Sequence, residues 1–162
     1  MTTTNLKFIF FVSTVLLLSG TTYSQTAQAT TEKPALNNNA FHGSVSPSII
    51  YLAASIYYER IVYKSEKMAY FAKAGYGAYT IIMSGTGDFI VAQGGIITGA
   101  DKSHFEAGLG ATYFSTFDDS SIKKVLPAAY AGYRRQKPRG NGVFRVGFGF
   151  PEFLYVGWGF SF

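Results

Sequence analysis

The sequence predicts an all-β fold: a closed, antiparallel, up-and-down transmembrane β-barrel of eight strands. Three observations predict it. Hydrophobic residues alternate with small or polar ones in eight successive segments, which is the period of a strand with one apolar face. Only 14% of the residues are charged and 17% are aromatic, whereas a soluble domain carries about a quarter charged residues. The last segment places large apolar side chains on one face and glycine, serine or tyrosine on the other.

The first 29 residues are expected to be a cleaved signal peptide and not part of the fold. Lys7 precedes the apolar run 8–18, which is shorter than the roughly 20 residues that a spanning helix needs. Ala27-Gln28-Ala29 is typical of a cleavage site, and cleavage after Ser24 is the alternative. Residues 30–162 then form the barrel domain, with 30–40 as a polar lead-in. The chain has no cysteine, so we expect no disulfide and no cysteine-based metal site.

Turn chemistry separates the eight segments. An even number of strands puts both ends of the domain on one side of a membrane, and closure leaves no backbone edge unpaired in hydrocarbon. The longest connection is 116–125, residues 84–88 are expected to be a turn, and Pro151-Glu152 is expected to be a tight turn. The expected strands are 40–46, 52–63, 68–83, 89–99, 104–115, 126–136, 143–150 and 154–162.

Charged residues and glycines share one face of the strands. Lys73 alternates in phase with Gly75, and Arg145 with Gly147. This face is assigned to the lumen, because an eight-stranded barrel is just wide enough for side chains to fill it. The segment 89–97 is apolar on both faces apart from Gln93, so its orientation stays open. Two rings of aromatic residues are expected at the membrane interfaces: Tyr63, Tyr70, Tyr133 and Phe162 at one end, and Tyr113, Phe114, Phe150 and Phe153 at the other.

The chain ends Gly157-x-x-Phe160-x-Phe162, which resembles the C-terminal assembly signal of outer-membrane β-barrels. Several further blocks of residues resemble those of small, eight-stranded outer-membrane β-barrel proteins of Gram-negative bacteria, a family that is mostly uncharacterised. The resemblance implies the cell outer membrane as location and outer-membrane lipid and the barrel assembly machinery as partners. It implies no known activity. The blocks are Tyr58-Glu59-Arg60, Lys73-Ala74-Gly75-Tyr76-Gly77, His104-Phe105-Glu106-Ala107-Gly108, Gly132-Tyr133-Arg134 and Phe144-Arg145-Val146-Gly147.

One residue departs from this pattern. Arg135 stands between Arg134 and Gln136, where an aromatic residue is expected, and it faces outward. Near the edge of a membrane its guanidinium can reach the headgroups. The net charge of +5 does not indicate nucleic-acid binding, because the basic residues are scattered beside turns.

Inward-facing charges form the candidate site, which we expect to be a lumen charge network. Each lies within about six residues of a turn at the end with the chain termini, so at about 3.3 Å per residue they gather in one layer. Arg134 should lie close to Arg145, with Glu106 as the anion between them. Glu59 should lie opposite Lys73 if the turn between them has an odd number of residues. The expected members are Glu59, Lys73, Glu106, Arg134 and Arg145.

Other polar residues favour structural interpretations. His104-x-Glu106 places an imidazole and a carboxylate on one face, as an acid–base pair or a metal site requires, but interior polar residues with ordinary hydrogen bonds are favoured. Asp118 and Asp119 indicate a solvated loop rather than calcium, since no third spaced ligand follows.

These observations predict a monomeric barrel with a structural or surface-interaction role, no open pore, no enzymatic activity and no cofactor. Two alternatives stay open. One is a lipid-modifying enzyme on the same scaffold, for which the rim offers only scattered serine, histidine and acidic residues. The other is a small transport or ligand-binding barrel, whose outward face should be charged if it is soluble.

Overall fold

The computed structural model describes residues 36–48, 51–65, 67–82, 85–99, 102–115, 125–138 and 140–162. The expected signal peptide 1–29, with its cleavage positions at Ala29 and Ser24, and the loop with Asp118 and Asp119 lie outside the described residues. No helix in the described ranges is long and apolar enough to cross a membrane. The strands are β1 (Asn39–Pro47), β2 (Tyr51–Lys64), β3 (Met68–Ile81), β4 (Gly85–Thr98), β5 (Ser103–Phe114), β6 (Val125–Gln136), β7 (Gly142–Phe150) and β8 (Phe153–Ser161).

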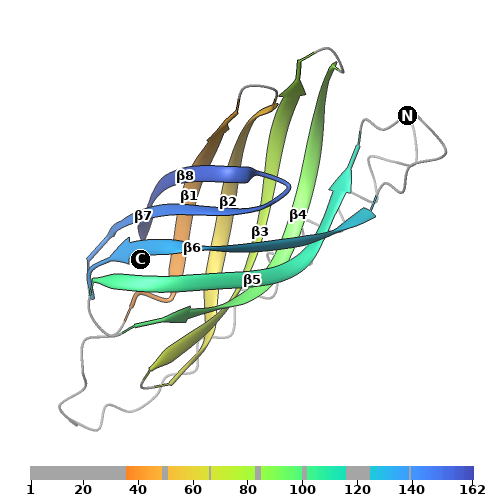
Figure 1. Ribbon diagram of the computed structural model, residues 1–162. Helices are drawn as coiled ribbons and strands as arrows, with labels where there is room; N and C mark the ends of the chain where they lie inside the picture. The colour runs from red at the N-terminus through yellow and green to blue at the C-terminus, as the bar shows by residue number, and fades with distance from the viewer. Residues whose placement is uncertain are drawn as a thin grey trace, which may run out of the picture. The chain divides into compact units, whose positions relative to one another are not determined.

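The eight strands form a closed barrel in chain order. Each strand pairs antiparallel with the next, and β1 pairs with β8 to close the sheet. Figure 1 shows the front strands β5–β8 crossing those behind at a large angle, as tilted strands of a barrel do. The amide of Asn39 donates to the carbonyl of Phe162 at 3.0 Å, and the amide of Phe162 donates back at 2.8 Å. The predicted fold class is therefore confirmed, with the start of β1 and the end of the chain side by side.

The predicted alternation of faces is present in every strand. Along β2, buried and exposed residues alternate from Tyr51 to Tyr58. The orientation of β4, which the sequence left open, is also settled: Phe89 and Val91 are buried, whereas Ile90 faces outward with 38% of its surface exposed. The register explains this choice, because Gln93 pairs with the inward-facing Lys73 of β3.

The register between β2 and β3 contains an irregularity that the sequence did not indicate. Glu59 lies directly opposite Lys73, as expected, but the register shifts between Ile61 and Tyr63. Lys64 pairs with Ala69, so the turn itself holds an even number of residues. The expected odd-numbered turn is wrong, because a β-bulge within the strand takes the extra residue.

The expected turn at 84–88 is wrong for residues 85–88, which begin β4. Thr86 pairs with Thr80, and Asp88 pairs with Ala78. Gly85 has φ of 101°, a left-handed conformation that glycine adopts without steric penalty. The chain has reversed direction by Gly85, so residues 85–88 already belong to the β3–β4 ladder.

Two apolar clusters fill the lumen. One gathers at the end of the barrel opposite the start of β1 and the end of β8, and it includes Tyr51, Tyr79, Phe89 and Phe114. The other includes Phe71, Ile97, Tyr130 and Tyr155. Phe114 was expected in an outer aromatic ring, but only 4% of its surface is exposed, and its ring packs edge-on against Tyr79 at 5.6 Å.

Phe150 departs from the same expectation, since it is half-buried and packs against the first cluster. Phe114 stands in the inward phase of β5. Phe150 shares the outward phase of Phe148 but is the last residue of β7, and its ring packs against that of Phe114 with centroids 6.0 Å apart.

Candidate functional site

The lumen holds a cluster of buried ionisable side chains, which we call the lumen charge network. None of them has more than 6% of its surface exposed. Ions buried so deeply are strongly unfavourable unless they are paired and hydrogen-bonded. Each ion of the network therefore needs a partner inside the lumen. Its members are His42 of β1, Glu59 of β2, Lys73 of β3, Glu106 of β5, Arg134 of β6 and Arg145 of β7.

Arg134 joins three strands. Its Nη1 lies 2.5 Å from Oε1 of Glu59 and 3.7 Å from Oε2 of Glu106. Its Nε and Nη2 donate to Oε1 of Gln136 at 2.9 and 2.6 Å. A planar guanidinium can make all these bonds at once, which a lysine ammonium cannot. Arg134 thus has Glu59 as its near carboxylate and Glu106 as a more distant one.

Arg145 has Glu106 as its near carboxylate. Its Nε and Nη2 each lie 2.6 Å from Oε1 of Glu106, and the hydroxyl of Tyr155 donates to the same oxygen at 3.2 Å. Arg134 and Arg145 are directly opposite in the β6–β7 register, so Glu106 does approach both arginines, as predicted. The structure adds that each arginine has a carboxylate of its own.

His42 lies between the two ion pairs. Arg145 Nη1 lies 2.8 Å from Nε2 of His42, and the same ring nitrogen lies 3.9 Å from Oε2 of Glu59. The imidazole also stacks on the ring of Tyr57, with centroids 5.1 Å apart. Sequence reasoning missed His42, because nothing in the first strand indicates which residues lie across the lumen from it.

Lys73 is held differently from the arginines. It is opposite Glu59 in the register, yet it forms no ion pair with any carboxylate of the described residues. Its Nζ lies 3.6 Å from the ring centroid of Tyr130 and 4.8 Å from that of Tyr57. The electron-rich faces of these rings attract the ammonium, so Lys73 is stabilised mainly by aromatic contacts.

Glu152 is a second residue that sequence reasoning missed. It was expected in the turn after β7, but its carboxylate is buried and accepts hydrogen bonds from Ser44 and Ser55. The hydroxyl of Tyr51 donates to the carbonyl of Pro151 at 2.7 Å. Phe153 has φ of 56°, which bulky residues rarely adopt. The turn therefore bends inward and places a carboxylate in the lumen.

A count of the charges in the predicted network would have indicated that one buried anion was missing. The five predicted network residues comprise two glutamates against three cations, which leaves one positive charge without a counterpart. With Glu152 added, the buried Glu, Lys and Arg residues number three of each sign.

His104 does not form a site with Glu106. Its Nδ1 lies 3.2 Å from the carbonyl oxygen of Thr98, and its Nε2 lies 3.1 Å from that of Gln136. Within the part of the chain that the structure describes, no group of His, Asp and Glu residues is suited to holding a metal ion. Neither described histidine ring is hydrogen-bonded to a serine hydroxyl, as nucleophilic catalysis by serine requires.

Comparison with solved structures identifies one similar fold. The outer membrane protein Ail of Yersinia pestis, solved in a phospholipid bilayer nanodisc, matches with a TM-score of 0.52 over 78% of this chain and 99% of Ail. The two sequences are 12% identical, so the likeness concerns the fold. No family model matches the chain, and no curated protein matches it.

The C-terminal residues of β8 have the orientation expected of an assembly signal. Phe160 and Phe162 point outward, with 53% and 60% of their surfaces exposed. Their ring centroids are 5.9 Å apart. Gly157 faces the lumen, where an added Cβ would lie 2.9 Å from the carbonyl oxygen of Gly43. The geometry thus presents both rings to the surroundings of the barrel, and their reading by an assembly machinery stays a prediction.

Proposed function

We propose that this protein is an integral outer-membrane β-barrel with a structural or surface-interaction role and a lumen filled by side chains. One observation carries the proposal: the barrel is inverted relative to a soluble protein. Glu106 and Arg134 are 0% and 1% exposed, whereas Leu109 and Phe148 are 73% and 67% exposed. Soluble proteins bury such ions completely only when they are paired, and they rarely expose contiguous apolar surface of this extent.

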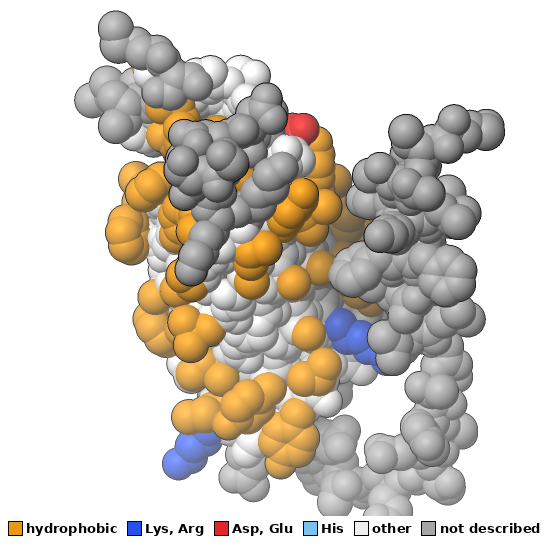
Figure 2. Space-filling view, turned by 90° about the vertical axis from the view of Figure 1, so that its right-hand side faces the viewer, with side chains coloured by type: hydrophobic (Ala, Val, Ile, Leu, Met, Phe, Trp, Pro, Cys, Tyr) orange, Lys and Arg blue, Asp and Glu red, His pale blue; other side chains and the backbone are white. Residues whose placement is uncertain are grey.

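The outward face is suited to hydrocarbon. On the side shown in Figure 2, hydrophobic side chains lie over much of the barrel surface and few charged ones are visible. In water, apolar surface of this extent would be unfavourable by about 25 cal/mol per Å² and would favour aggregation. In lipid the same surface needs no cover, and the closed ladder leaves no strand edge exposed.

The filled lumen argues for a structural or interaction role rather than a pore. Tyr57, Tyr130 and Tyr155 are buried across its middle, and the aromatic cluster around Phe89 and Phe114 lies towards the end opposite the start of β1. We expect the protein to work as a monomer, with outer-membrane lipid around it and the barrel assembly machinery as a partner during biogenesis. The fold shared with Ail, an outer membrane protein, supports this location.

Extraction tests the location. Membranes from cells that produce the protein are washed with alkaline carbonate and with high salt, and a known periplasmic protein serves as the control. The barrel should stay in the pellet while the control is released. Recovery of the barrel in the supernatant would overturn the proposal.

Conductance tests the closed lumen. The purified barrel is inserted into planar bilayers, and insertion is verified by protease protection of the strands. We expect no steady ion current, because side chains occupy the lumen. Stable, stepwise conductance would contradict the closed lumen and support a transport role instead.

A further inference from the structure

A groove runs along the outer surface of β6–β8 at the end of the barrel where β1 starts and β8 ends. Arg135 is directly opposite Phe144, and Phe144 is directly opposite Trp158, so the three outward side chains form a row. The rings of Phe144 and Trp158 are 5.7 Å apart. Beside this row lies a hollow of about 530 Å³. Its other lining residues are Lys137, Gly140, Asn141, Gly142, Val143 and Gly159.

The groove combines an apolar wall with two cations. Arg135 and Lys137 are exposed, and neither forms an ion pair within the described residues. An added Cβ at Gly142 would meet no atom within 4 Å, so no side chain among the described residues closes the hollow there. Both guanidinium and ammonium groups are therefore free to bind an anion at the edge of an apolar surface.

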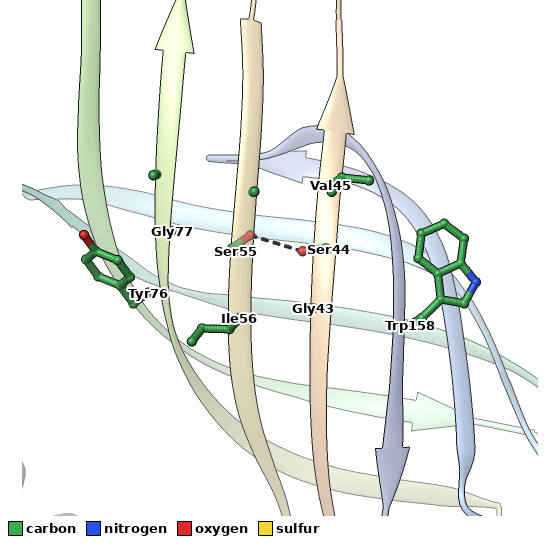
Figure 3. A pocket seen from close by; sticks show the side chains of 10 residues that line it. Gly43, Ser44, Val45, Ser55, Ile56, Tyr76, Gly77 and Trp158 are labelled. Carbon is green, nitrogen blue, oxygen red and sulfur yellow. Dashed lines mark hydrogen bonds between the residues drawn. The ribbon is translucent and has the colours of Figure 1, made fainter.

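A second hollow continues the same surface towards the middle of the barrel. It has a volume of about 470 Å³, and small residues such as Gly43 and Ala54 line it. Figure 3 shows Trp158 on one side of Gly43, with Ile56 and Tyr76 on the other. Trp158 lines both hollows, and it is directly opposite Gly43 in the β1–β8 register. Together the hollows form a path from two cations to an apolar recess.

Among the described residues, the cations on the outside of the barrel lie at the end where β1 starts and β8 ends, and the outer charged side chain at the other end is Asp88 of β4. Glu66, Asp101 and Arg139 of the first end, and Asp118, Asp119, Lys123 and Lys124 of the second, lie outside the described residues. Basic residues at a membrane surface attract anionic lipids. The cations are Arg60, Lys64, Lys67, Lys102, Arg135 and Lys137.

We propose that this groove binds an anionic phospholipid from the leaflet at the end of the barrel where β1 starts and β8 ends. The phosphate of the lipid lies between Arg135 and Lys137, and one acyl chain of the lipid runs past Phe144 and Trp158 towards Gly43. Arg135 and Lys137 are singled out from the other cations because they line a groove with an apolar wall. The inference rests on the proposed function, since it requires the outward face to lie in lipid.

Trp158 provides a local probe, because it is the only tryptophan of the chain. The protein is reconstituted in phosphatidylcholine vesicles that contain one minor component with brominated acyl chains, which quench nearby tryptophan fluorescence. The component is either phosphatidylglycerol or phosphatidylcholine, at the same mole fraction. Quenching by brominated phosphatidylcholine reports contact with lipid as such. A bound anionic lipid should add to it, so we expect at least twofold stronger quenching by brominated phosphatidylglycerol.

Two matched double variants locate the effect. Arg135→Gln with Lys137→Gln should abolish the excess quenching by phosphatidylglycerol. Arg60→Gln with Lys67→Gln removes the same two residue types at the same end but outside the groove, and it should keep the excess. All four side chains lie outside the lumen, so both variants should fold.

Three outcomes would overturn the inference. Equal quenching by the two brominated lipids in the unaltered protein would mean that no anionic lipid is enriched beside Trp158. Equal loss of the excess quenching in both double variants would mean that the basic residues at this end attract anionic lipid diffusely and that the groove does not bind it. Persistence of the excess in the Arg135→Gln, Lys137→Gln variant would place the lipid elsewhere. Absence of quenching by either lipid would instead contradict the membrane location itself.

Discussion

Arg134 and Glu59, 75 residues apart in the chain, are joined by an ion pair of 2.5 Å inside the lumen. Their strands, β6 and β2, are not neighbours in the barrel, so the pair spans the lumen and is no part of a strand ladder. Arg145 and Glu106 join β7 to β5 in the same way. Polar contacts thus connect opposite walls of this barrel, where a soluble barrel would use an apolar core.

The first prediction concerns the charge of Glu106. Glu106→Gln should lower the free energy of unfolding in detergent by about 3 to 5 kcal/mol, because it leaves the buried guanidinium of Arg145 without its carboxylate. Adding Arg145→Gln should restore part of this loss. Urea unfolding of the single and double variants measures the coupling between the two residues, which should exceed about 1 kcal/mol.

The pair of Glu106 with Arg134 is the internal comparison, since these groups are 3.7 Å apart rather than 2.6 Å. Its coupling should be the weaker of the two. Small and additive effects throughout would mean that water screens the charges and that the residues do not act as a network.

The second prediction concerns the inward turn. Glu152→Ala should destabilise the barrel by about 1 to 3 kcal/mol, because the buried hydroxyls of Ser44 and Ser55 lose their acceptor. Glu152→Gln keeps an acceptor oxygen and should have a smaller effect. Urea unfolding and limited proteolysis measure stability and the exposure of the turn. Equal effects of the two substitutions would show that the negative charge, and not the hydrogen bonding, stabilises the turn.

The third prediction concerns space in the lumen. An added Cβ at Gly75 would lie 2.2 Å from the ring of Tyr57 and 2.6 Å from the carbonyl oxygen of Ile56. Gly75→Ala should therefore cost about 1 to 3 kcal/mol through overpacking. Gly43→Ala is the control, because its Cβ would make only an ordinary contact of 3.5 Å with Ser55. Similar urea midpoints for the two variants would argue against tight packing around Tyr57.

The fourth prediction concerns the last residue. Phe162→Ala is preferable to deletion, since both backbone hydrogen bonds between Phe162 and Asn39 are retained. If the assembly machinery reads the exposed ring, the folded yield in cells should fall several-fold. The stability of the refolded barrel in detergent should change little, because 60% of the surface of Phe162 is exposed. Parallel losses in both settings would indicate a packing role alone.

Much of the fold was predictable because the signal is local. The period-two alternation directly shows which side of a strand is apolar, and glycine- and proline-containing turns separate the strands. The inward positions of Glu59, Lys73 and Arg145 followed from this alternation, as did the approach of Arg134 to Arg145 across a short turn.

The pairing inside the lumen was decided only by the tertiary structure. Residues on non-neighbouring strands meet according to the stagger accumulated around the barrel, and the bulge in β2 changes that stagger by one residue. Arg134 therefore finds Glu59, and His42 joins the network, although no spacing in the sequence relates them. Glu152 enters the lumen because serines of β1 and β2 donate hydrogen bonds to its carboxylate there. Alternation determines which face a side chain takes, but only closure of the barrel determines what lies opposite.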